Sequence, residues 1–156
     1  MGIGSNSPIY DVLLLAHIVC ALGGFGANGL AGFYASQLYP RPSEAATRYF
    51  SSPRFLAEKL IYLVPVFGLI LIGISRGPSE LAKPWVLIGI AAWIAAVAIA
   101  HSVVWPAERR VSQLINTPEN EGEIQALGKR LARGAMALNL IFVTALVVMI
   151  IQIGGK

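Results

Sequence analysis

Residues Pro84 to Ala107 read PWVLIGIAAWIAAVAIAHSVVWPA and contain no Asp, Glu, Lys or Arg. A helix that crosses a bilayer needs about 20 predominantly apolar residues, and this run is long enough. Membrane strands are shorter and alternate lipid-facing with polar side chains, a pattern that this run lacks. The run therefore predicts a transmembrane α-helix, whose backbone hydrogen bonds are all made within the segment.

The rest of the chain extends this prediction. Its 156 residues are 56% hydrophobic and only 13% charged, whereas a soluble domain carries about 25% charged residues. Apolar runs predict spans at about 9–36, 56–75, 84–106 and 133–153. Short connections favour antiparallel neighbours. We therefore predict an all-α integral membrane protein, a single transmembrane domain over residues 1–156, folded as an antiparallel four-helix bundle.

Basic residues are distributed unevenly between the two sides of this predicted bundle. Of the 12 Lys and Arg residues, only Arg76, Lys83 and Lys156 lie on the side of the termini. Cytoplasmic loops carry the excess of positive charge in membrane proteins. The pattern predicts both termini outside and both longer loops in the cytoplasm, facing anionic headgroups of the lipid bilayer. The net charge of +4 then requires no nucleic-acid partner.

Span one contains the segment LAHIVCALGGFGANGLAG, in which glycines and a histidine interrupt an apolar run. A wheel drawn at about 100° per residue gathers its small and polar side chains on one face. In chain order this face holds His17, Cys20, Gly24, Asn28 and, at its edge, Gly32. The last four recur at every fourth position, which predicts a helix-packing seam. Alternatively, the face lines a cofactor pocket, because polar groups inside a span are costly and commonly functional.

His17 is the candidate cofactor ligand on this face. Imidazole is a common axial ligand of haem iron, and glycine lets a flat ligand approach the backbone closely. The predicted site is a haem b bound at its iron by His17, with Gly24 and Asn28 lining the pocket and Met149 at a similar depth. His101 is predicted about 15 Å or more away along the membrane normal, so the two histidines do not share one iron. A quinone, pigment or lipid is an alternative occupant.

The segments LLLAHIVCALGGFG in span one and VVWPAERRVSQL at the end of span three resemble a group of small four-span bacterial membrane proteins. The group includes the integral membrane family DUF2269, the CopD-type copper-resistance proteins and the HemJ-type protoporphyrinogen oxidases. Resemblance to the HemJ type implies a b-type haem at His17, although the lysine that this type uses in span three has no counterpart here. The resemblance also implies the bacterial inner membrane.

Three function classes follow from these observations. Small size, short loops and the lack of a Walker loop, nucleophile elbow or Ser/His/Asp set favour a non-catalytic subunit or assembly partner of a larger electron-transport complex, or a homo-oligomer. The alternative is a haem-binding redox protein or HemJ-like oxidase that uses His17. The second alternative is a CopD-like metal-handling or transport protein, for which spaced Met, His or Cys ligands are absent.

Overall fold

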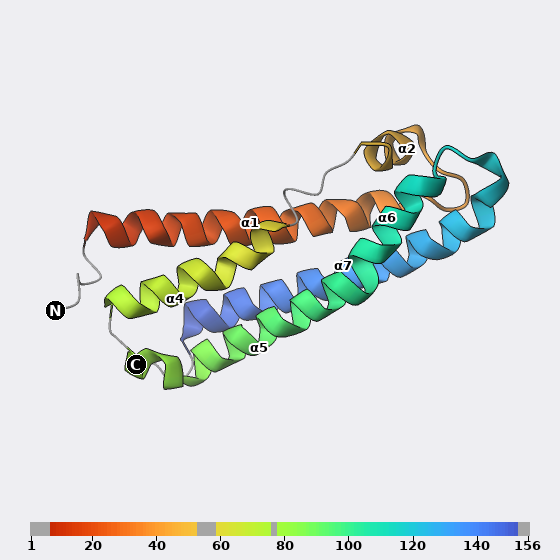
Figure 1. Cartoon of the computed structure of the whole chain (residues 1–156). Coiled ribbons are helices and arrows are strands. Elements are labelled where there is room, and N and C mark those ends of the chain that lie inside the picture. The colour runs from red at the N-terminus through yellow and green to blue at the C-terminus, as the bar shows by residue number, and fades with distance from the viewer. Residues whose placement is uncertain (1–6, 53–58, 76–77, 153–156) are drawn as a thin grey trace.

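The computed structural model describes residues 7–52, 59–75 and 78–152, and every regular element in these ranges is helical (Figure 1). Three helical rods are long and apolar enough to cross a membrane, which confirms the prediction of an all-α chain suited to a lipid bilayer. They are α1 (Pro8–Ser36), the rod Pro84–Leu114 and α7 (Glu121–Ile151).

The middle rod is continuous although it contains an internal proline. It consists of α5 (Pro84–Ile99), the π-helical turn η3 (Ala100–Val104) and α6 (Trp105–Leu114). Pro84 lies in the first turn of α5, where an N–H has no helical partner in any case. Pro106 cannot donate to a carbonyl one turn earlier, and the wider turn just before it lets the rod pass this position.

The structure describes the second predicted span, 56–75, from Lys59 onward. Residues 56–58 lie outside the described ranges, and the helix there comprises η1 (Lys59–Tyr62) and α4 (Leu63–Ser75). Its apolar part, Lys59–Ile74, falls below the length of the three long rods. At 1.5 Å per residue it extends about 24 Å, against a hydrocarbon core of about 30 Å.

The helices pack in the order α4, α1, α7, α5. Helix α1 lies along both α4 and α7, and α7 also lies along α5, whereas α4 and α5 approach each other closely at few positions (Figure 1). The α1–α7 contacts run antiparallel: Gly32 lies against Ala135, and the Phe25 and Phe142 rings stack with centroids 4.6 Å apart. The η1 turn that precedes α4 meets the α5 rod through side chains, as in the hydrogen bond from Trp93 Nε1 to the Ile61 carbonyl, and α1 and α7 are the central pair of the packing.

At one end of the molecule, short helices and helix ends pack together beyond the apolar parts of the rods. Here α2 (Glu44–Phe50), α6, the short turn η4 (Pro118–Asn120) and the first turns of α7 meet the end of α1. We call this structure the end cap. Helix α7 begins well before the apolar run at 133 because its first turns bury Ile124 in the cap. The cap core is formed by Leu38, Ala46, Phe50, Val111, Ile115 and Ile124.

The opposite end of the rods is closed by a shorter connection. The turn η2 (Pro78–Ala82) joins α4 to α5 and contacts both helices. Within it, the buried Glu80 carboxylate lies 2.8 Å from the Lys83 ammonium, next to the start of α5. The N-terminal end of α1 and the C-terminal end of α7 lie at this same end, away from the cap (Figure 1).

Candidate functional site

The small residues of span one lie at contacts with two different helices. A Cβ added at Gly24 would lie 2.7 Å from the Ile61 backbone nitrogen, and one added at Gly32 would lie 2.4 Å from the Ala135 Cβ. Gly24 therefore admits the backbone of η1, and Gly32 admits α7. Cys20 and Asn28, the other two members of the predicted seam, are buried as well.

Asn28 is a fully buried polar side chain on this face. Its Nδ2 donates to the Gly24 carbonyl at 2.7 Å, one turn back on the same helix. Its Oδ1 is buried and has no hydrogen-bond partner among the described residues. One half of the amide is thus satisfied locally, and the other half lies unpaired between α1 and its neighbours, at a typical cost of about 1–3 kcal/mol.

His17 joins α1 to α4 through a specific hydrogen bond. Its Nδ1 lies 2.9 Å from the Val64 carbonyl oxygen. A carbonyl can only accept, so Nδ1 carries the hydrogen and donates, which leaves the lone pair of a neutral ring on Nε2. Gly68 makes room for the ring, because a Cβ there would lie 3.3 Å from His17 Cε1. The structure thus fixes the orientation of this half-buried imidazole.

Met149 lies at about the depth of His17 but contacts another helix. The stacked pair Phe25–Phe142 sets the register of the antiparallel helices α1 and α7. His17 lies about two turns before Phe25, and Met149 lies about two turns after Phe142, so the two side chains are at about the same depth. The Met149 methyl packs on α5, 2.7 Å from where a Cβ at Gly89 would lie. The imidazole therefore faces α4 while the thioether faces α5, and no described contact brings the two together.

His101 forms a separate cluster at the other end of the rods. Its Nε2 is hydrogen-bonded to the Tyr62 hydroxyl, and its ring meets the Trp105 ring edge-on with centroids 4.5 Å apart. The contact between Gly134 and Val104 places His101 level with about Leu30 on α1. That position is about 13 residues, or about 20 Å, from His17. The two histidines accordingly belong to different sites.

Two prolines create polar contacts that the sequence pattern alone does not reveal. Pro65 has no N–H for the carbonyl of Ile61, and this oxygen accepts from Trp93 Nε1 at 2.9 Å. Pro106 likewise has no N–H for the carbonyl of Ser102, and this oxygen accepts from the Arg130 guanidinium at 3.2 Å. The sequence does indicate which carbonyl lacks its helical donor, because this is the carbonyl four residues before a proline. The donor comes from another helix in each case and is known only once the helices are packed.

The described surface is hollowed where α2 leaves the end of α1. An open cavity of about 520 Å³ is lined by two aromatic residues, two charged residues and an alanine. These are Tyr34, Glu44, Ala45, Arg48 and Tyr49. The Tyr34 and Tyr49 rings stack with centroids 4.4 Å apart and so join α1 to α2. Sequence analysis does not identify this cavity, because its two walls lie apart in the chain.

The described residues contain no group of three or more His, Cys, Asp or Glu side chains placed to hold a metal ion. The single cysteine, Cys20, is buried with a free thiol. No family model matches the chain, and comparisons with curated proteins and solved structures found no similar protein. The candidate sites therefore rest on the geometry of this chain: the His17 imidazole, the His101 cluster and the cavity in the end cap.

Proposed function

We propose that the protein is a non-catalytic subunit or assembly partner of a larger membrane complex, of the electron-transport kind, and that the end cap is its docking surface. The observation that carries this proposal is the buried core of the cap. Fixing the backbone of a loop costs about 1–2 kcal/mol per residue, and the cap offsets that cost by burying Leu38 and Phe50 to 2% exposure or less. A surface with its own core is preorganised to bind a partner.

The outer face of the cap supplies charge for such a partner. Arg110 pairs with Glu123 at 2.8 Å on this surface, and further basic side chains lie exposed around the cap. They are Arg41, Arg48, Arg109 and Lys129. Complementary charge speeds the encounter between partners and sets their orientation. Exposed glutamates lie among them, so a partner surface at this end would meet a rim of mixed charge; they are Glu44, Glu119, Glu121 and Glu123.

The proposal includes a topology of four crossings in a bacterial inner membrane, with both termini outside and the cap in the cytoplasm. Three rods have the required length, and we propose that η1 with α4 is the fourth crossing. A short apolar helix can be accommodated by local bilayer thinning and by flanking side chains that extend to the interface. The contact of Ile61 with Gly24 places the exposed Lys59 level with about Gly26, on the membrane side of Tyr34, so the bilayer would have to thin at this end of the crossing.

Site-specific crosslinking tests the docking proposal. A photoreactive residue at Gln113, exposed on α6 in the cap, should yield a discrete adduct with a partner chain in intact membranes. The same residue at Asp11, exposed near the start of α1, is the matched control and should give none. Adducts of equal yield from both positions, or none from Gln113 in a folded protein, would refute docking at the cap.

Thiol labelling of intact cells tests the topology separately. In a Cys20→Ala background, Asp11→Cys should react with an impermeant maleimide, and Gln113→Cys should react only after the membrane is opened. Both side chains are exposed in the structure, so burial does not explain a difference between them. The reverse pattern would invert the topology. Labelling of both or neither in intact cells would contradict the placement of these two ends on opposite sides.

A second candidate function is haem binding at His17, and the orientation of its ring favours it. The hydrogen bond from Nδ1 to the Val64 carbonyl fixes the tautomer that leaves the lone pair on Nε2, as in many ligating histidines. Haem would supply one-electron chemistry when bound. His17 would be its axial ligand from this chain, and Gly24 would not line the pocket because Ile61 already packs against it.

An absorption spectrum of the purified protein tests this second candidate. A Soret band that is lost in His17→Ala and retained in His101→Ala would support it, because the two histidines lie in separate sites. A colourless, folded protein from haem-replete cells would reject haem binding and leave the docking proposal standing.

A further inference from the structure

We propose that the cavity between α1 and α2 binds the headgroup of one phospholipid of the phosphatidylethanolamine type, whose acyl chain lies along the exposed face of α1. The cavity is open, and its walls are two tyrosines, one carboxylate and one guanidinium. This inference stands apart from partner docking, because it concerns the isolated chain and one lipid.

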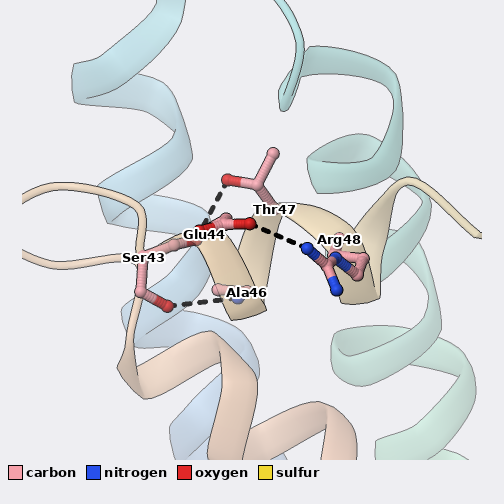
Figure 2. Close-up of polar contacts among 5 residues, drawn as sticks. All are labelled: Ser43, Glu44, Ala46, Thr47 and Arg48. Carbon is pink, nitrogen blue, oxygen red and sulfur yellow. Dashed lines mark hydrogen bonds and ion pairs between the residues drawn. The ribbon is translucent and has the colours of Figure 1, made fainter.

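The two charged side chains of the cavity are held by a well-defined helix start. Figure 2 shows that Ser43 Oγ accepts from the Ala46 N–H, at 3.1 Å, and that Thr47 Oγ1 donates to the Ser43 carbonyl. One turn of helix then brings the Arg48 guanidinium to 2.7 Å from the Glu44 carboxylate (Figure 2). The Ser43 contacts thus fix the backbone from which one positive and one negative side chain extend beside the cavity.

The charge pattern selects the class of headgroup. The Glu44 and Arg48 side chains are 87% and 80% exposed, and an ion pair in that environment is weak and easily exchanged. A zwitterionic headgroup carries the same two charges: its phosphate can accept from Arg48, and its ammonium can donate to Glu44. A headgroup with only a phosphate would leave Glu44 facing an anion. A choline headgroup has no N–H to donate.

The depth of the cavity suits a lipid. The contact of Gly32 with Ala135 brings Tyr34 level with about Arg133 on α7. Tyrosine and arginine side chains are typical of the membrane interface, where headgroups lie. The cavity therefore opens at headgroup depth, with the apolar part of α1 continuing from it into the bilayer.

A continuous apolar face of α1 leads away from the cavity. Phe33 is 59% exposed and contacts Tyr34, with ring centroids 5.4 Å apart, and Leu30 is 52% exposed one turn further into the span. The next residue on this face is Gly26, where no atom lies within 4 Å of an added Cβ. The glycine leaves a shallow path between larger side chains, along which an acyl chain can lie.

Native mass spectrometry of the full chain, delipidated in mild detergent and titrated with single phospholipids, tests the proposal. Wild type should retain one phosphatidylethanolamine about two- to fivefold more strongly than phosphatidylglycerol or phosphatidylcholine, the range expected for one exposed ionic contact. Glu44→Gln should abolish the preference over phosphatidylglycerol. Arg48→Gln should weaken binding of all three lipids, because each carries the phosphate.

The chain offers a matched control for these variants. Arg110 and Glu123 form another exposed ion pair, away from the cavity, and Glu123→Gln removes the same charge there. Glu123→Gln should bind as wild type does, and melting curves should show that all variants fold, since the altered side chains are exposed. Equal retention of the three lipids by wild type, or an equal effect of Glu44→Gln and Glu123→Gln, would overturn the proposal.

Discussion

Replacing Gly24 with alanine would test whether the close approach of α1 to η1 holds the fold together. The new Cβ would lie 2.7 Å from the Ile61 nitrogen and 3.1 Å from its Cα. Both atoms belong to the backbone, so a side-chain rotation cannot relieve the contact and η1 must move as a unit. Gly26 is the matched control, since a Cβ there meets no atom within 4 Å.

The magnitude follows from the difference between the two substitutions. Alanine in place of glycine favours a helix interior by about 0.5–1 kcal/mol, and this gain applies to both positions. Overpacking of a well-packed contact costs about 1–3 kcal/mol and applies only to Gly24. Gly24→Ala should therefore be less stable than Gly26→Ala by about 1–3 kcal/mol, while Gly26→Ala should match or exceed wild type.

Unfolding in mixed micelles, followed by far-UV circular dichroism as the denaturing detergent fraction rises, measures this difference. The comparison is internal, because both variants add one methyl group to the same helix two positions apart. If Gly24→Ala proves as stable as Gly26→Ala, the backbone contact between α1 and η1 is not closely packed, and the packing argument for the seam fails.

Three more outcomes are expected from the same structure. Trp93→Phe should destabilise the protein by about 0.5–1.5 kcal/mol, because the Ile61 carbonyl loses its donor. The same unfolding assay should show little loss for Trp85→Phe, since the buried Trp85 Nε1 has no described partner. Ser43→Ala should destabilise the start of α2 by about 0.5–2 kcal/mol, because the Ala46 N–H loses its acceptor. Amide hydrogen exchange should become faster over 44–50 and stay unchanged in α7, and an equal acceleration in both would contradict a local effect. The buried Cys20 thiol should resist maleimide until the helices unfold, and prompt labelling of the native protein would contradict its burial.

The long helices follow from the sequence because charge cannot lie in the hydrocarbon core. The run 9–36 corresponds to α1, and 84–106 lies within the rod Pro84–Leu114. The run 133–153 corresponds to the later turns of α7, which extends from Glu121 to Ile151. Its polar first turns are helical because Ile124 is buried in the end cap, a tertiary contact that hydropathy does not reveal.

The candidate seam shows why the neighbours of a helix face are hard to predict. Each step of four residues advances about 40° around a helix, so Gly24 and Gly32 differ by about 80°. That rotation turns Gly24 toward η1 and Gly32 toward α7. The wheel groups these small residues on one face, but the partner of each depends on how the other helices are placed. The same limit applies to Met149, whose depth follows from the sequence and whose contact with α5 does not.

The central position of α1 and α7 has a consequence for the order in which the fold can be completed. These are the first and last long helices of the chain, so their mutual contact joins residues that are synthesised furthest apart. Before α7 is inserted, α1 can pair with α4, but the surfaces of Phe25 and Gly32 have only lipid as a neighbour. Helix α5 must also wait for its principal partner. The central contacts of the fold and the main packing surface of α5 are therefore both supplied by α7, the last of the three long rods.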